Sequence, residues 1–261
     1  MNYQVLATDY DGTLAHHSTV DEPTQAALQQ LLQSGRRLVM VTGRELPELI
    51  QVFPYTAWFE LIVAENGALL YRPATGEEKV LGEAPSEAFL DELTARGVAP
   101  MSVGRAIVAT WEPHEQTVLD VIRDLGLERQ VIFNKGAVMI LPAGVNKATG
   151  LTAALIEMGV SPHNVVGVGD AENDHAFLQM CGMSAAVANA LPSIKETARL
   201  VLSQGHGAGV SELIDRIVAS DLAELEIVAP PQIDRDHMAL GELSPEESFY
   251  FRGPEGKLAL R

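Results

Sequence analysis

The stretch Val5-Leu6-Ala7-Thr8-Asp9-Tyr10-Asp11-Gly12-Thr13-Leu14 joins a short apolar run to two carboxylates spaced two residues apart. Segments with helical periodicity follow at residues 24–32, which Pro23 opens, and at 151–158. Strands that alternate with helices predict βαβ units, and therefore an α/β fold with a parallel sheet flanked by helices. Three further apolar runs are of strand length and are bounded by polar or glycine residues: 37–41, 61–64 and 164–168.

The pattern changes between residues 72 and 142, where helix and strand signals no longer alternate regularly. We therefore expect residues 1–71 and 143–219 to form a discontinuous main domain, into which 72–142 is inserted as a small α+β domain. Asn66-Gly67, a hairpin turn signal, lies just before this insertion. The insertion has helix candidates at 86–95 and 115–125 and strand candidates at 105–111, 130–134 and 137–141.

Residues 220–261 form an acidic segment that contains Pro230-Pro231. Two interpretations stay open: a solvated tail or linker, or a connection to a further domain in a longer polypeptide.

Composition restricts the partners of the protein. Hydrophobic residues make up 47% and charged residues 20%, as in ordinary globular proteins. The formal net charge of -17 disfavours nucleic acid as a partner, and it would also repel an anionic metabolite unless a cation were recruited locally. Cys181 is the single cysteine, and the chain contains no signal-peptide pattern and no apolar run of membrane-spanning length. We therefore expect a cytoplasmic protein without a membrane partner; the sequence does not indicate its oligomeric state.

Asp9 and Asp11 lie at the end of a predicted strand, where both side chains can point to one side and converge on a divalent cation. Gly12 then lets the backbone turn sharply. The same pattern also occurs in plain strand-ending turns and in calcium loops. A calcium loop is excluded because the closing glutamate and the preceding helix are missing.

A second acidic group, Gly169-Asp170-Ala171-Glu172-Asn173-Asp174, follows a valine-rich strand. Asp170 and Asp174 are hard oxygen ligands of the kind that Mg²⁺ requires. Helix capping by Asp170 and a helix-dipole contact by Asp174 are the alternative interpretation. Capping explains one acid, but it does not explain the pairing with the first acidic group.

Two further segments offer partners for a phosphate group. Thr42 and Gly43 end the second strand with a hydroxyl and free backbone amides, which suit a phosphate oxygen but also suit a capped turn. Lys147, at the start of a helix, can stabilise negative charge on phosphoryl oxygens, although a lysine in that position is usually solvated.

The order Asp-x-Asp-Gly-Thr, Thr-Gly-Arg, Lys, Gly-Asp-x-x-Asn-Asp resembles the four motifs of the haloacid dehalogenase-like superfamily. Glu65-Asn66-Gly67-Ala68 and Ala188-Asn189-Ala190 followed by Lys195 are similar to its Cof-type sugar-phosphatase branch, subfamily IIB. The resemblance covers roughly residues 3–218. It implies a Rossmann-like core with a cap of the C2 type, here a short one like that of archaeal phosphoglycolate and trehalose-phosphate phosphatases.

The resemblance also implies a role for each motif residue. Asp9 would attack phosphorus and form an aspartyl-phosphate, and Asp11 would act as the acid and then the base. Mg²⁺ would be held by Asp9, the backbone carbonyl of Asp11 and Asp170, with Asp174 a direct or water-mediated ligand. The phosphoryl oxygens would be held by Thr42, Gly43, Lys147 and Asn173.

The predicted activity is Mg²⁺-dependent hydrolysis of a small phosphate monoester, either a sugar phosphate or phosphoglycolate. Alternatives are a phosphomutase of the same superfamily, or a phosphate-binding regulatory module fused to a partner domain. Specificity should depend on cap side chains such as Arg105, Glu112 and Lys135, which the sequence does not rank.

Overall fold

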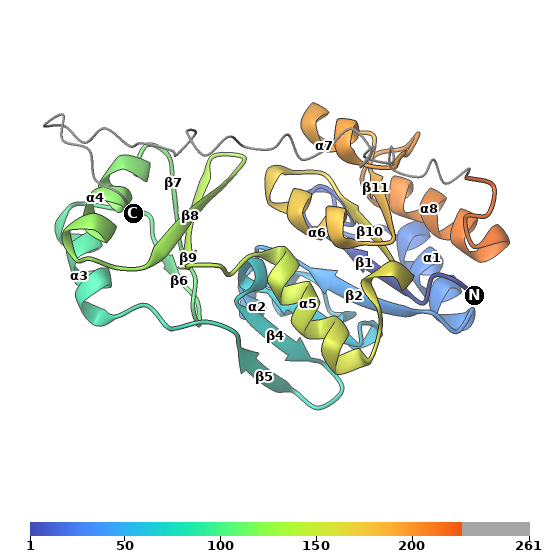
Figure 1. The fold of residues 1–261 in the computed structure, drawn as a ribbon, viewed down its shortest axis with the longest axis horizontal. Helices are drawn as coiled ribbons and strands as arrows, with labels where there is room; N and C mark the ends of the chain where they lie inside the picture. Colours follow the sequence, from blue (N-terminus) through green and yellow to red (C-terminus); the bar gives the residue numbers. More distant parts are fainter. Residues whose placement is uncertain (226–261) are drawn as a thin grey trace, which may run out of the picture. The chain divides into compact units, whose positions relative to one another are not determined.

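A computed structural model describes residues 1–225 and shows a mostly parallel main sheet (Figure 1). Among the described residues this sheet has eight strands in the order β12-β11-β10-β1-β2-β3-β4-β5. The strands from β12 to β3 run parallel, whereas β4 and β5 are antiparallel additions at one edge. In chain order they are β1 Val5–Thr8, β2 Arg37–Val41, β3 Leu61–Ala64, β4 Leu69–Arg72, β5 Glu77–Val80, β10 Val165–Gly169, β11 Met183–Ala186 and β12 Leu200–Val201.

The central strands carry apolar residues on both faces, which explains their position in the middle of the sheet. Every residue of β1, β3 and β10 is buried, as expected for strands of a parallel sheet that is covered by helices on both sides. β1 pairs with β10 and β2 in register, with Val5 opposite both Val165 and Arg37. The predicted α/β fold with a parallel sheet is confirmed.

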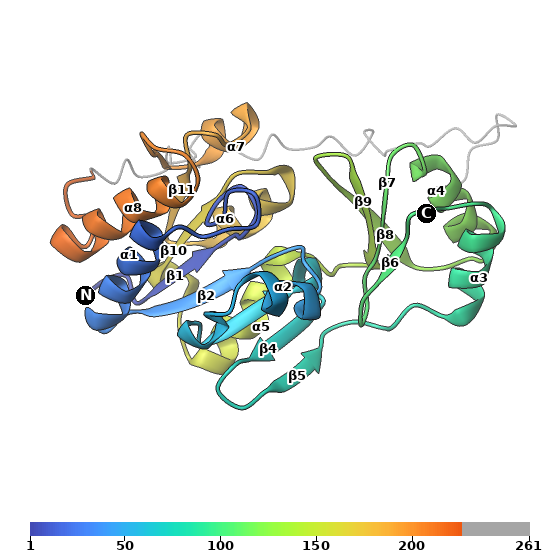
Figure 2. The ribbon, with the colours of Figure 1, turned by 180° about the vertical axis from the view of Figure 1, so that it is seen from behind.

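Helices cover both faces of the main sheet. The helices α1, α2 and α8 lie on the face turned to the viewer in Figure 2, and α5 and α6 lie on the face seen in Figure 1. Asp21 caps α1 by accepting a hydrogen bond from the Thr24 amide, and Gly205 precedes α8 as its N-cap. The bounds are α1 Glu22–Gln33, α2 Leu46–Val52, α5 Lys147–Met158, α6 His175–Met180, α7 Pro192–Thr197 and α8 His206–Ser220, with 3-10 turns at Thr56–Trp58, Glu65–Gly67, Pro162–Asn164 and Glu172–Asp174.

The inserted segment forms a second, antiparallel sheet with the order β6-β7-β9-β8. Helices α3 and α4 pack on one face of this sheet through a buried cluster that includes Phe89, Val118 and Ile140. A second cluster, with Ile107 and Met139, joins the insertion to Ala68 of the main domain. The elements are α3 Glu87–Ala95, β6 Ser102–Val103, β7 Val108–Trp111, α4 Glu115–Asp124, β8 Arg129–Asn134 and β9 Ala137–Pro142.

Two element boundaries differ from the sequence expectation. β5 is hydrogen-bonded to β4 in the main sheet, so residues 72–80, which we assigned to the insertion, extend the main domain instead. β7 begins at Val108 rather than at Arg105, because the amides of residues 105–107 donate to the Glu65 carboxylate and not to a neighbouring strand. Glu65 therefore ties the start of β7 to the main domain.

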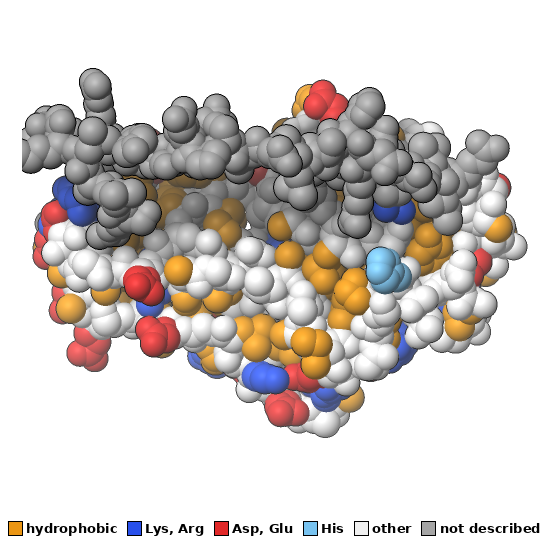
Figure 3. Space-filling model, in the orientation of Figure 1, with side chains coloured by type: hydrophobic (Ala, Val, Ile, Leu, Met, Phe, Trp, Pro, Cys, Tyr) orange, Lys and Arg blue, Asp and Glu red, His pale blue; other side chains and the backbone are white. Residues whose placement is uncertain are grey.

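The surface carries hydrophobic and charged side chains side by side. Figure 3 shows hydrophobic side chains over α5 and charged ones of both signs near β5. In that region Glu157 forms ion pairs with Arg72 and Lys79. The helices in residues 1–225 are all too short or too polar to cross a membrane. The expected tail beyond residue 225 lies outside the described residues.

Candidate active site

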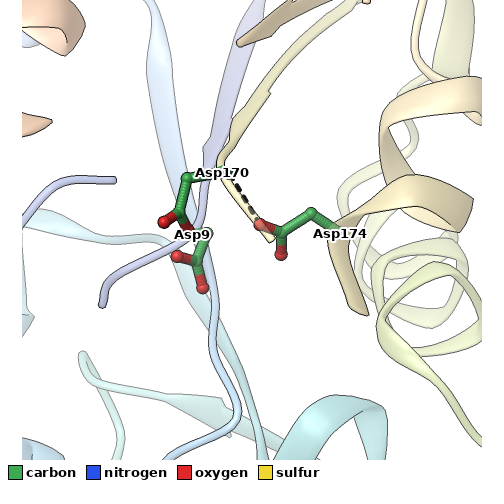
Figure 4. A group of neighbouring side chains, drawn as sticks. All are labelled: Asp9, Asp170 and Asp174. Carbon is green, nitrogen blue, oxygen red and sulfur yellow. Dashed lines mark hydrogen bonds between the residues drawn. The ribbon is translucent and has the colours of Figure 1, made fainter. Parts of the chain in front are cut away.

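Three buried carboxylates meet at the carboxyl edge of the main sheet. Asp9 follows β1 and Asp170 follows the neighbouring parallel strand β10, so the sheet itself brings the two side chains together. Asp174 comes from the 3-10 turn that opens α6 and faces them from the other side (Figure 4). One carboxylate oxygen from each of the three lies within 4.8 Å of the others.

Gly12 is required by this close approach. Its backbone has φ = 89°, and a Cβ at this position would lie 2.3 Å from Oδ2 of Asp170. The next residue, Thr13, is buried and donates its hydroxyl to Oδ1 of Asp170 at 3.2 Å. The turn after β1 therefore holds Asp170 in place.

Lys147 is the first residue of α5 and lies between two of the carboxylates. Asn146 caps this helix in a capping box with Thr149, which fixes where Lys147 enters the site. The ammonium is buried and donates to Oδ1 of Asp9 at 2.6 Å and to Oδ1 of Asp174 at 2.5 Å. Burial lowers the pKa of Lys147, but Asp174 and Asp9 outweigh it, so the pKa is raised and the lysine stays charged.

The charge of this cluster is not balanced by protein cations alone. Burial, together with repulsion from Asp174 and Asp170, raises the pKa of Asp9 to about 8 despite the opposing attraction of Lys147. Burial likewise raises the pKa of Asp170. Buried carboxylates with raised pKa values and an all-oxygen donor set fit a hard divalent cation, which would favour their ionised forms.

Asp174 is more fully engaged by protein groups than the other two carboxylates. Oδ2 accepts hydrogen bonds from the amides of Asp170 and Ala171, at 2.8 and 3.0 Å, while Oδ1 accepts from Lys147. These contacts orient the loop that carries Asp170 and hold the lysine. Of the ligands implied by the resemblance, Asp9 and Asp170 fit direct binding better, and Asp174 fits a supporting or water-mediated contact.

Asp11 points to Arg44, a residue of the Thr-Gly-Arg motif to which the sequence analysis gives no role of its own. The guanidinium donates to both oxygens of Asp11, at 2.6 and 2.7 Å, and also contacts Glu48 and Ser18. Its hydrogen bond to Asp11 is the largest cause of a raised pKa for Arg44. Asp11 is 44% exposed at the cavity, so it is oriented but accessible.

The expected phosphate-binding residues are divided between the surface of the site and the layer below it. Gly43 and Asn173 line the cavity. Asn173 donates to Oδ1 of Asn66 at 3.0 Å, and its own Oδ1 is buried without a hydrogen-bond partner among the described residues. Thr42 is fully buried, and its hydroxyl accepts from the Arg44 amide at 3.1 Å, as expected for the capped turn.

These groups surround one cavity of about 340 Å³ between the main sheet and the inserted sheet. Asp9, Asp11, Lys147 and Asp170 contribute from the main domain, while Ala109, Trp111, Asn134, Lys135, Ala137 and Met139 contribute from the insertion. Lys135 donates to Oδ2 of Asp170 at 2.6 Å. The insertion therefore supplies a wall of the site, as a cap does.

The structure ranks the three cap residues that the sequence left unranked. Lys135 lines the cavity, whereas Arg105 pairs with Glu78 at 3.0 Å and Glu112 is exposed outside the cavity. Arg44 and Glu65 were not assigned a role from the sequence. The signal that could have identified them is their place inside quoted motifs close to strand ends: Glu65 directly follows β3, and Arg44 lies three residues after β2.

Known proteins resemble this chain over most of its length. The model of the haloacid dehalogenase-like hydrolase family matches residues 6–96 and 107–214. The phosphoglycolate phosphatase of Methanothermobacter thermautotrophicus is 30% identical over 224 residues, covering 82% of this chain and 99% of that protein. Phosphoglycolate phosphatase 2 of Saccharolobus solfataricus is 30% identical over 231 residues, covering 85% and 96%.

The fold has a solved counterpart in a sugar phosphatase of subclass IIB. The two structures have a TM-score of 0.68 at 17% identity, covering 82% of this chain and 98% of the other. The match of the family model to most of the chain confirms the resemblance first seen in the four motifs. This chain belongs to the haloacid dehalogenase-like hydrolase family.

Proposed function

We propose that this protein is a Mg²⁺-dependent phosphatase that hydrolyses the phosphate monoester of a small metabolite through an aspartyl-phosphate on Asp9. The observation that carries this proposal is the cluster of Asp9, Asp170 and Asp174 with Lys147, of which Asp9, Asp170 and Lys147 line the cavity. Such a cluster can hold a divalent cation beside a carboxylate nucleophile and can neutralise charge on a phosphoryl group.

The residues divide the reaction into two displacements. Lys147 holds Oδ1 of Asp9, which leaves Oδ2 to attack phosphorus as the bond from phosphorus to the leaving alcohol breaks. Asp11 gives its proton to that alcohol, then takes a proton from the water that attacks the aspartyl-phosphate and releases inorganic phosphate. One oxygen of Asp11 must leave Arg44 when it carries the proton.

Bound Mg²⁺ would shield Asp9 from the negative charge of the phosphate and polarise a phosphoryl oxygen. Asp9, Asp170 and the backbone carbonyl of Asp11 would hold it, with Asp174 in support. Gly43, Lys147 and Asn173 would position the phosphoryl oxygens, because they line the same cavity. Thr42 would act through the turn that it stabilises.

The test is release of inorganic phosphate from an aryl phosphate with and without Mg²⁺. We expect Asp9→Asn to abolish release, because the amide cannot attack phosphorus, while Asp91→Asn on the exposed face of α3 leaves it unchanged. Magnesium and phosphate binding by the wild type without any turnover would contradict the proposal. Phosphoglycolate belongs in the first substrate panel, because two relatives are named as phosphoglycolate phosphatases.

A further inference from the structure

Lys135 occupies an unusual position at the tip of the β8–β9 hairpin. Asn134 pairs with Ala137, so Lys135 and Gly136 are the two central residues of the turn, with φ of 50° and 86°. Turns of this kind favour asparagine, aspartate or glycine at both positions. A lysine with left-handed backbone angles destabilises the turn by roughly 1 kcal/mol. A lysine in this strained position therefore points to a role outside the turn.

The side chain of Lys135 differs from the other cations that line the cavity. Lys147 is buried between two carboxylates, and the guanidinium of Arg44 is held by Asp11, Glu48 and Ser18. The side chain of Lys135 is 48% exposed, comes from the cap, and has Asp170 as its anionic partner. It is therefore the cavity cation best placed to change partners.

The proposed reaction also requires Asp170, the partner of Lys135, as a ligand of the metal. Nζ of Lys135 lies 2.6 Å from Oδ2 of Asp170. A divalent cation bound to the same oxygen would lie close to this ammonium, and the two positive charges would repel each other strongly. Binding of the metal would therefore release Lys135 into the cavity. An anionic group on the leaving alcohol can then take the place of Asp170.

A polar atom next to Lys135 also lacks a partner. Oδ1 of Asn134 is buried without a hydrogen bond among residues 1–225, and Asn134 lines the same cavity. An acceptor in that position is satisfied by a hydroxyl group. The cavity of about 340 Å³ has room for an alcohol larger than the two-carbon glycolate.

On the basis of the proposed function, we infer that the Asn134–Lys135 turn selects phosphate esters of hydroxy acids. Lys135 binds the carboxylate of the leaving alcohol, and Oδ1 of Asn134 accepts a hydrogen bond from its hydroxyl. Neutral polyol and sugar phosphates satisfy only the second contact. The rival role for Lys135 is a contact to the transferred phosphate itself, which every substrate would share.

The experiment compares 3-phosphoglycerate with glycerol 3-phosphate, which have the same length and differ in a carboxylate against a hydroxymethyl group. We expect wild type to show a kcat/KM roughly tenfold to hundredfold higher for 3-phosphoglycerate, because a hydrogen bond to a charged group contributes this much. Lys135→Met should remove that preference, and Lys135→Arg should restore part of it. Asn134→Ala should lower kcat/KM for both esters and leave their ratio unchanged.

Lys79→Met is the matched control, because Lys79 is an exposed lysine that pairs with Glu157 away from the cavity. A second measurement, titration of Mg²⁺ by calorimetry without substrate, tests the exchange at Asp170. We expect Lys135→Met to bind Mg²⁺ about twofold to fivefold more tightly than wild type, as for loss of a half-exposed ion pair, and Lys79→Met to match wild type.

Three results would overturn the inference. Equal loss of kcat/KM on both esters in Lys135→Met would assign Lys135 to the transferred phosphate. Equal kcat/KM values for both esters in wild type would show that the protein does not select for a carboxylate. An unchanged Mg²⁺ affinity in Lys135→Met would show that the metal and Lys135 do not compete for Asp170. Absence of Mg²⁺-dependent hydrolysis for every ester would instead refute the proposed function, and this inference with it.

Discussion

The stability of the metal-free protein should fall as pH rises, and the cause should be Asp9. Its pKa in the folded protein is about 8, compared with 3.8 for an ordinary aspartate, because the carboxylate is buried beside Asp174 and Asp170. The folded state therefore holds this proton more tightly than the unfolded chain. The stabilisation is complete below about pH 4 and is lost as pH rises towards about 8.

The magnitude follows from the size of the shift. About four pKa units correspond to on the order of 5 kcal/mol, and roughly two thirds of this lies between about pH 5 and about pH 8. The raised pKa of Lys147 keeps that lysine charged throughout this range, so its contribution stays constant. Asp9→Asn removes the titration, and the variant should lose about 3 to 4 kcal/mol less than wild type over the same range.

The measurement is the free energy of unfolding in urea, at several pH values, for wild type, Asp9→Asn and the exposed control Asp91→Asn, with a chelator present. Added Mg²⁺ should flatten the wild-type curve, because a bound cation favours the ionised carboxylate. If the free energy of unfolding changed equally with pH for wild type and Asp9→Asn in the chelator, the reasoning would be refuted. Such a result would show that Asp9 does not titrate with a raised pKa in the folded protein.

Two further substitutions test the framework of the site. Lys147→Met should destabilise the metal-free protein by about 3 to 5 kcal/mol in urea unfolding, because Asp9 and Asp174 lose their buried cationic partner; a change as small as that of Lys79→Met would contradict it. Glu65→Ala should speed hydrogen exchange at the amides of residues 105–107, which donate to the Glu65 carboxylate at 2.8 to 3.2 Å, while Glu77→Ala, at an exposed position of β5, serves as the control. Unchanged exchange at these amides would show that Glu65 does not hold the start of β7.

The central strands could be predicted from the sequence because their burial leaves a direct signal. A strand covered by helices on both faces is a continuous apolar run, as in β3 with Leu61–Ala64. The edge strand β5 has no such signal, because Glu77–Val80 is exposed throughout and its polar sequence does not indicate a strand. Its place in the main sheet follows from pairing with β4, which local pattern does not encode.

The same difference applies to the site. The proximity of Asp9, Asp170 and Lys147 could be predicted because each follows a strand or opens a helix, and parallel topology brings such positions to one edge. The partners of Arg44 and Lys135 could not be predicted. Each of these contacts crosses between elements more than thirty residues apart, and depends on distances that only the packed fold defines.

The charge of the cavity connects the composition of the chain with its proposed chemistry. A net charge of -17 implied that an anionic substrate would need a local cation, and the fold supplies Arg44, Lys135 and Lys147 at one place. Each of them is already paired with a carboxylate, so the protein cations orient the acidic groups without reversing their charge. The raised pKa values of Asp9 and Asp170 show that negative charge remains unbalanced in the cluster. A bound divalent cation would ionise Asp9 for attack and release Lys135 towards the substrate, so one binding event would prepare both the nucleophile and the selection of the leaving group.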